Sequence, residues 1–203
     1  MGQQYAKTMF GEAAKRLQAQ HGSRAQYERL AESGPSHDAL TASEAAFIAE
    51  RDSLYLASVT VDGWPYVQHR GGPKGFLRVL DGKTLAFADF AGNKQYITTG
   101  NVETNDRVAL FLMDYPNQAR LKIIGHARIV EPGMDAALEA RVRVEGYKAK
   151  VERVVVIAVR PMTGTARSTL RRDGRRRRFR RCRGDSAKPG RILRWSPLLR
   201  RNP

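Results

Sequence analysis

The sequence is short of the residues on which disulfide and metal sites depend. The chain of 203 residues contains one cysteine, Cys182, and four histidines. A single cysteine excludes an internal disulfide and any zinc site built on several thiolates. The histidines are scattered without the spacing of metal ligands, so we expect no metal site. No histidine stands near Cys182 in the sequence, which disfavours a cysteine nucleophile.

Long hydrophobic runs are also missing. No run of about 18 apolar residues exists, which predicts that no helix crosses a membrane. The N-terminus lacks an apolar segment followed by small residues, so we expect no secretory signal and a cytoplasmic location. Walker loops, Gly-x-Ser-x-Gly elbows and a Gly-x-Gly-x-x-Gly turn after a strand are absent too, so no sequence motif supports a nucleotide-triphosphate or hydrolase site.

Positive charge is abundant but unevenly distributed. The net charge is +16, of which residues 161–203 contribute +13 and residues 1–160 only +3. The segment RRDGRRRRFRRCRGD has no apolar period of either kind, so it cannot bury one face. We therefore expect an N-terminal helical extension over residues 1–40, a folded domain over residues 41–160 and a basic, disordered tail over residues 161–203.

The segment before residue 52 favours helices. Good helix formers occupy residues 13–20 and 24–31, and Ser23 is placed to cap the second of these helices. Thr41 and Glu44 have capping-box spacing ahead of an apolar helix that should run to about Arg51. Further helices are expected to begin within residues 93–99 and to span residues 134–144.

The centre of the chain favours strands. Short alternating or apolar segments occur in residues 53–70, 76–90, 107–130 and 151–159, with turns at Asp62-Gly63 and Asp81-Gly82. About six antiparallel strands with short turns, and helices at the margins, predict a mainly β (α+β) fold built as a small closed or half-open barrel.

Two turns could bind an anion. The first, HRGGPK, combines glycines that let a ligand approach the backbone with the charges of Arg70 and Lys74, which suit a phosphate. The second, DFAGNKQ, is a strand-to-helix junction where free backbone N–H groups and Lys94 form an anion site. The alternative, that both are ordinary turns with solvated charges, stays open at this point.

A third candidate lies on the long strand predicted near residues 120–130. Arg120 and Lys122 share one face of that strand by its period of two, and two neighbouring cations require an anion or solvent. Taken alone, a solvated strand face accounts for both. His126 shares their face, and a neutral, hydrogen-bonded histidine is its simplest assignment.

Taken in order, these pieces resemble the pyridoxamine 5′-phosphate oxidase-like family of FMN-binding split barrels, in its uncharacterised bacterial branch. The resemblance covers roughly Thr41 to Val159. It begins at the capped helix and continues through SLYLASVTVDGWPYVQHRGGPKGFLRVLDGKTLAFADFAGNKQYITTGN, DRVALFLMDYP and RLKIIGHARIVE. The resemblance rests on the order of these segments and on their amino-acid sequences together. It implies a six-stranded antiparallel split β-barrel with N-terminal and peripheral helices.

The resemblance also implies a homodimer with FMN in clefts between the subunits. The strand that bears His69 and Arg70 would run along the flavin, and Lys94 would lie near its phosphate. Arg120 would approach the flavin ring, where a cation stabilises the charge that the flavin gains on reduction. The full set of candidate FMN-binding residues is His69, Arg70, Gly71, Lys74, Ala88, Asp89, Asn93, Lys94, Gln95 and Arg120.

The chain departs from the vitamin B6 oxidase itself in the phosphate region. Gln95 stands where the oxidase has the second residue of a basic pair, so phosphate affinity would depend more on Lys94 and Arg70. Pyridoxamine 5′-phosphate is therefore a doubtful substrate, and the sequence identifies neither the substrate nor the electron donor.

Three functions follow from these observations. The resemblance favours an FMN-dependent oxidoreductase of unknown substrate, in which the flavin performs the redox chemistry. A non-catalytic FMN-binding protein would need the same barrel without an organised substrate site. A nucleic-acid-binding protein would use the Arg-rich tail, but residues 1–160 carry no basic stripe interleaved with exposed aromatics that would support it.

The tail has the composition of a sequence read in the wrong frame. Met162 to Asp173 (MTGTARSTLRRD) can be encoded so that reading from the third base of the Met codon gives DWNCPQHITPR. That peptide resembles the C-terminal motif of the same family, whose Trp and polar residues approach the flavin ring. Although synonymous codons were chosen for the match, the last two bases of each shifted codon are largely fixed by the next residue. The alternative is a genuine basic tail that binds nucleic acid or anionic lipid.

We predict that one base has been lost near codons 160–161. Sequencing the gene there should show a shifted frame that spells the motif above. A DNA sequence whose shifted frame spells anything else contradicts the prediction. If the frame is shifted, the chain lacks part of its flavin site, FMN binds weakly or not at all, and neither Cys182 nor Trp195 has a function.

Overall fold

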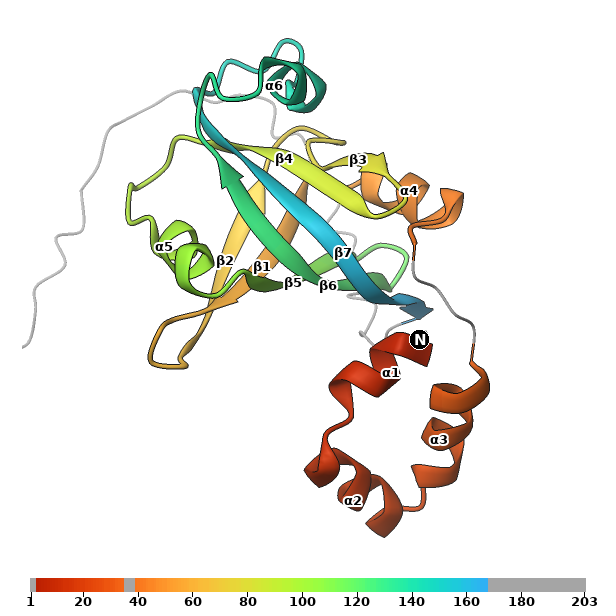
Figure 1. Cartoon of the computed structure of the whole chain (residues 1–203). Coiled ribbons are helices and arrows are strands. Elements are labelled where there is room, and N and C mark those ends of the chain that lie inside the picture. The colour runs from red at the N-terminus through yellow and green to blue at the C-terminus, as the bar shows by residue number, and fades with distance from the viewer. Residues whose placement is uncertain (1–2, 35–38, 168–203) are drawn as a thin grey trace, which may run out of the picture. The chain divides into compact units, whose positions relative to one another are not determined.

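The fold is built on one antiparallel sheet with helices at its margins (Figure 1). The computed structural model describes residues 3–34 and 39–167, so the predictions for the rest of the tail, including those for Cys182 and Trp195, lie outside the described residues. The described helices are α1 (Gln3–Met9), α2 (Glu12–Gln20), α3 (Arg24–Ser33), α4 (Ala42–Ala49), α5 (Ile97–Thr104) and α6 (Ala136–Val142). None of the helices in these residues is long and apolar enough to span a bilayer.

The described strands number seven, and their order in the sheet is β2-β1-β5-β6-β7-β4-β3. Their bounds are β1 (Ser53–Val59), β2 (Pro65–Gly71), β3 (Arg78–Asp81), β4 (Thr84–Phe90), β5 (Arg107–Asp114), β6 (Ala119–Val130) and β7 (Val151–Arg167). The predicted mainly β, antiparallel split barrel is confirmed, with seven strands in the sheet where about six were expected. β3 is a four-residue edge strand that pairs with β4 alone, in the hairpin that the sequence predicted over residues 76–90.

A β-hairpin forms each end of the sheet, β1–β2 at one end and β3–β4 at the other. The β1–β2 connection closes with a bond from the Thr60 N–H to the Trp64 carbonyl (2.9 Å), and Gly63 adopts φ +85° within it. A positive φ of this kind is easy for glycine and costly for most other residues. The Asp81 carboxylate accepts a 2.7 Å bond from the Lys83 N–H and so fixes the β3–β4 turn. Both turns were predicted from their Asp-Gly pairs.

The core lies on one face of the central strands. Leu110 and Leu112 of β5 and Leu121 and Ile123 of β6 are almost fully buried there, together with Ile48 of α4. Burial along β5 alternates, as expected for a strand with one covered face.

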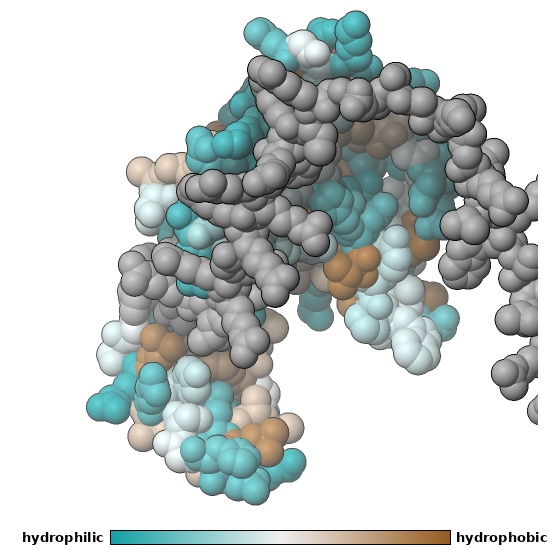
Figure 2. All heavy atoms as spheres, turned by 180° about the vertical axis from the view of Figure 1, so that it is seen from behind, coloured by the Kyte–Doolittle hydropathy of each residue, from teal (hydrophilic) through white to brown (hydrophobic). Residues whose placement is uncertain are grey.

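The other face of β5 is only partly covered. Ala109, Phe111 and Met113 are half-buried on it. Phe111 lies opposite Tyr55 of β1, a tyrosine that is itself 38% exposed. Apolar side chains thus continue across neighbouring strands on a face that nothing in the described chain covers completely. In the view from behind, hydrophobic residues are visible only as small areas among hydrophilic ones (Figure 2).

Helix α4 is fixed at both ends. At its start, Thr41 accepts a bond from the Ser43 N–H while the Glu44 carboxylate accepts one from the Thr41 N–H (3.0 Å), which confirms the predicted capping box. Just beyond its end, Arg51 pairs with Asp114 of β5 at 3.0 Å, with both side chains at least 85% buried. The Arg51 guanidinium also donates to the carbonyls of Phe47 and Met113. Arg51 therefore ties the helix to the sheet.

The helix expected to begin within residues 93–99 starts at Ile97, as predicted, directly after Lys94 and Tyr96, whose left-handed backbone conformations an α-helix cannot contain. Two other elements differ from the sequence-based expectation. The last strand continues from Val159 to Arg167, since its backbone pairs with β6 regardless of side-chain pattern. The helix α1 was not predicted at all. The division of the chain at residues 40 and 160 stays a prediction.

We predict that the half-covered face of β5 forms a homodimer. An apolar strand that needs cover on both faces finds the second cover in another copy of the chain. Light scattering at micromolar concentration and high ionic strength, which screens the basic tail, should give twice the chain mass of 22.7 kDa. Phe111→Glu should shift the mass towards the monomer, whereas Trp64→Ala at the exposed β1–β2 hairpin should not. A monomeric wild-type protein contradicts this prediction.

We also predict that the Arg51–Asp114 pair makes the free energy of unfolding fall as the pH becomes acidic. Bonds from Asn117, together with the Arg51 charge, hold the pKa of the Asp114 carboxyl below its usual value. A lowered folded-state pKa stabilises the protein above the unfolded-state pKa, and this contribution is lost as the pH falls below about 5.

The measurement is urea unfolding between neutral and acid pH. Arg51→Met should lower the free energy of unfolding by about 3 kcal/mol at neutral pH, because it leaves a mostly buried carboxylate without its cation. The cost of Asp114→Asn should be largest at neutral pH and shrink towards acid pH. The control Glu50→Gln, in the exposed pair with Lys74, should cost less than about 1 kcal/mol. Equal costs of Asp114→Asn at both pH values would argue against the role of the pair.

Candidate functional site

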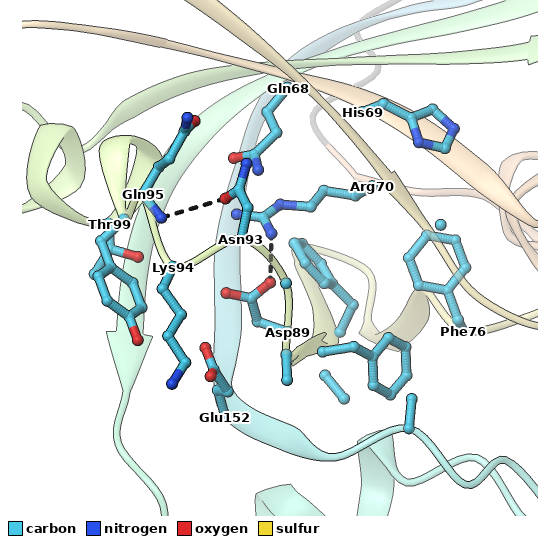
Figure 3. Close-up of a pocket in the computed structure, with 18 of the residues that line it drawn as sticks. Gln68, His69, Arg70, Phe76, Asp89, Asn93, Lys94, Gln95, Thr99 and Glu152 are labelled. Carbon is cyan, nitrogen blue, oxygen red and sulfur yellow. Dashed lines mark hydrogen bonds and ion pairs between the residues drawn. The ribbon is translucent and has the colours of Figure 1, made fainter. Parts of the chain in front are cut away.

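A cavity of about 410 Å³ opens where the ends of β2 and β4 meet the loop that precedes α5 (Figure 3). Residues of β2, the end of β4, the 91–96 loop, the first turn of α5 and the start of β7 line it. Among the sequence-predicted site residues, those on its wall are His69, Arg70, Gly71, Ala88, Asp89, Asn93, Lys94 and Gln95. The two predicted anion-binding turns, far apart in the sequence, thus meet at one cavity.

An ion pair crosses the floor of this cavity. The Arg70 Nη1 donates to Asp89 Oδ1 at 2.6 Å, and the two side chains are 17% and 7% exposed (Figure 3). Arg70 belongs to β2 and Asp89 to β4, which stand at or near opposite ends of the strand order. The pair therefore joins the two sides of the split barrel.

The electrostatics of this pair follow from its burial. Burial raises the pKa of the Asp89 carboxyl, while the nearby charges of Arg70 and Arg153 act in the opposite direction. The Arg70 Nε is buried and has no hydrogen-bond partner in the described part of the chain. Much of the Arg70 charge is balanced by Asp89, so within the described residues the guanidinium offers a buried, unpartnered donor at Nε rather than a free cation.

The loop before α5 has an unusual backbone. Lys94 has φ +58° and Tyr96 has φ +53°, both in the left-handed region that residues other than glycine seldom adopt. The Asn93 Oδ1 accepts a bond from the Gln95 N–H at 3.2 Å and braces the turn. Lys94 is exposed, and no ion pair is observed for it among the described residues. This loop holds an uncompensated cation at the rim of the cavity.

Helix α5 is attached to the sheet by polar contacts. The Thr98 hydroxyl donates to the Gln68 side chain of β2 at 2.8 Å, and the Asn101 amide donates to the buried Ser58 hydroxyl of β1 at 2.9 Å. No side chain caps the start of the helix at Tyr96. These bonds fix the direction of α5 and leave its first backbone N–H groups free of a side-chain cap.

Arg153 of β7 is a residue that the sequence analysis missed. It is 9% exposed, stands opposite Asp89 in the β4–β7 register, and its guanidinium lies 4.7 Å from the centre of the Tyr96 ring. Its Nη1 donates to the Thr99 hydroxyl at 3.1 Å. The available signal was the charged pair Glu152-Arg153 at the start of a strand that is otherwise apolar from Val151 to Val159.

Two predicted site residues lie away from the cavity wall. Lys74 is exposed and pairs with Glu50 at 3.2 Å. Arg120 stands opposite Met113 in the β5–β6 register, on the sheet face opposite the buried Leu121. The tight turn of HRGGPK carries Lys74 away from Arg70, and the pleat of β6 sends Arg120 to the outer face. Neither position could be inferred from the local sequence.

Two other polar side chains on the outer face of β6 have local partners. The Lys122 ammonium lies 5.5 Å from the centre of the Phe111 ring, a cation–π contact that replaces the anion or solvent expected from sequence. His126 Nδ1 lies 2.9 Å from Asp106 Oδ1, which confirms the expected hydrogen-bonded histidine. Within residues 3–34 and 39–167, no group of three or more His, Cys, Asp and Glu could hold a metal ion.

A second cavity of about 710 Å³ adjoins the first between α6 and strands β4 and β7. The two cavities share wall residues Ala88, Phe90, Tyr147 and Ala149. Phe90 and Tyr147 meet edge to face with their ring centres 4.9 Å apart. An aromatic pair thus stands between a polar cavity and a more apolar one.

Sequence comparison identifies one matching family model. The model described as pyridoxamine 5′-phosphate oxidase matches residues 40–179. This range starts one residue before the capping box of α4 and continues past the end of β7. No curated protein matches the chain in the same kind of comparison.

Solved structures also resemble the chain. HupZ of Group A Streptococcus is 20% identical, with a TM-score of 0.51 over 64% of this chain and 96% of its own, and shows the same fold. A candidate pyridoxamine 5′-phosphate oxidase of Lactobacillus delbrueckii is 25% identical, with a TM-score of 0.46 over 62% and 94%. An FMN-binding protein of Syntrophomonas wolfei is 14% identical, with a TM-score of 0.43 over 61% and 82%.

Proposed function

The chain belongs to the pyridoxamine 5′-phosphate oxidase family, and on that premise we propose that it is an FMN-dependent oxidoreductase of unknown substrate. The observation that carries the proposal is the convergence of both predicted anion-binding turns on one cavity. A flavin bound there would supply the transfer of electrons or hydride. The protein contributes binding, orientation and electrostatics.

The residues on the wall fit a phosphate group at the rim. Lys94 is an exposed cation, and the start of α5 has no side-chain cap, which together suit an anion. Arg70 has an unused buried Nε in the described chain. We propose that Lys94 binds the FMN phosphate, with Asn93 and Gln95 beside it, and that His69, Gly71, Ala88 and Asp89 contact the rest of the flavin.

Arg120 requires a second subunit for its proposed role. It lies on the sheet face that we expect to meet a partner, away from the cavity of its own chain. We propose that a homodimer brings Arg120 of one subunit towards the flavin of the other. Lys74 is paired with Glu50, so in our proposal its contribution to flavin binding is minor.

A non-catalytic FMN-binding protein is the second candidate. The observation that favours it is the internal pairing of charges in the cavity, where Arg70 pairs with Asp89 and Arg153 with Glu152. Such pairing leaves few groups to move protons for a substrate. Reduction of the bound flavin by NAD(P)H or by a panel of reduced substrates identifies an oxidoreductase, whereas failure with every donor favours simple binding.

We predict that Lys94→Ala weakens FMN more than riboflavin. Riboflavin lacks the phosphate, so loss of a charge-assisted contact should reduce FMN affinity about tenfold and leave riboflavin almost unchanged. Flavin absorbance and fluorescence titrations measure both affinities, in this chain and in a version with the C-terminal frame restored. Lys83→Ala, in the β3–β4 turn, is the matched control.

The outcomes separate the parts of this proposal. Equal weakening of FMN and riboflavin by Lys94→Ala would show that Lys94 does not contact the phosphate. A protein that binds neither flavin in either version would remove FMN from the proposal altogether. Binding of nucleic acid that survives removal of residues 161–203 would instead place a nucleic-acid site in the barrel.

A further inference from the structure

The 93–96 loop adopts a conformation that its own sequence disfavours. Lys94 and Tyr96 both have a positive φ, although neither is glycine, asparagine or aspartate. A backbone of this kind persists only where surrounding contacts hold it, and it often occurs at ligand sites. The Asn93–Gln95 bond is one such contact. That bond does not involve Tyr96, whose carbonyl accepts a bond from the Gly100 N–H at 2.9 Å and which is 47% exposed as a residue.

Arg153 contacts the side chain of Tyr96. Its guanidinium lies over the Tyr96 ring at 4.7 Å, and its Nη1 donates to Thr99 in the first turn of α5. One planar group therefore contacts both the last residue of the loop and the start of the helix. A lysine could not stack and donate sideways in this way, because its ammonium lacks a planar face.

Arg153 is itself held firmly by the sheet. It belongs to β7, pairs in register with Asp89 of β4, and its Nη2 donates to Glu152 at 3.3 Å. Its side chain is buried, and its Nε has no partner within the described residues. Arg153 thus connects a rigid part of the barrel to the loop that carries Lys94.

We propose that Arg153 is a positioning residue that holds the 93–96 loop in the conformation that directs Lys94 towards an anionic group in the cavity. The inference rests on the proposed function, since it takes the anion to be the flavin phosphate. Arg153 does not contact the phosphate. It reduces the cost of ordering the loop when the anion binds, so its effect on affinity passes through Lys94.

The first test measures the loop without any flavin. Hydrogen exchange of the amides of residues 93–104 should quicken about threefold to thirtyfold in Arg153→Gln, the range expected for loss of a cation–π contact. Arg153→Lys keeps the charge but loses the planar group and should behave like Arg153→Gln. Tyr96→Ala removes the other partner of the stack and should give the same local change. Arg128→Gln, an exposed arginine on β6, is the matched control and should change nothing there.

The second test measures flavin preference in the full chain and its frame-restored version. Arg153→Gln should reduce FMN affinity about threefold to thirtyfold while riboflavin affinity stays constant. Combined with Lys94→Ala, it should add little further loss, because both changes act on one contact.

The other possible results of these two tests would overturn either the role of Arg153 or the proposed function. Unchanged exchange in residues 93–104 in both Arg153→Gln and Tyr96→Ala overturns the inference. Equal loss of FMN and riboflavin with a lowered melting temperature shows a merely structural role and also overturns it. If the wild-type protein binds no flavin, the proposed function fails, while the exchange measurement still shows whether Arg153 holds the loop.

Discussion

The ion pair between Arg70 and Asp89 is the constraint on which the rest of the site depends. Its partners come from opposite sides of the sheet, so a 2.6 Å contact can form only when the sheet curls to bring β2 and β4 together. The same curvature brings the two anion-binding turns to a single cavity. A pair this deeply buried adds little net stability over an apolar contact, but breaking it is expensive, so it specifies how the barrel closes.

Charge in the cavity is organised in layers. The buried layer is close to neutral, because Arg70 is matched by Asp89 and Arg153 by Glu152. The exposed layer carries the Lys94 cation on a loop with a left-handed backbone. A neutral floor suits an uncharged ring system, and a cationic rim suits an acidic group. A ligand with an aromatic body and one phosphate matches that division.

The sequence predicted the features that depend on residues adjacent in the chain. It missed the contacts between residues that are far apart in the chain. The capping box at Thr41 and the Asp-Gly turns are local patterns, and both appear in the structure. The pairing of Lys74 with Glu50 depends on how α4 packs beside a turn, which no local pattern encodes. Arg153 was hidden for the same reason, because its significance comes from Tyr96, a residue on another element.

The pairing of β7 with β6 continues as far as Arg167, through the point where the composition of the chain changes. Strand pairing uses amide and carbonyl groups that every residue except proline supplies in full. The edge of β6 can therefore act as a template for whatever peptide follows Arg160, independent of its side chains. The continuation of β7 to Arg167 therefore agrees equally with a native tail and with a shifted reading frame, because backbone pairing does not distinguish the two.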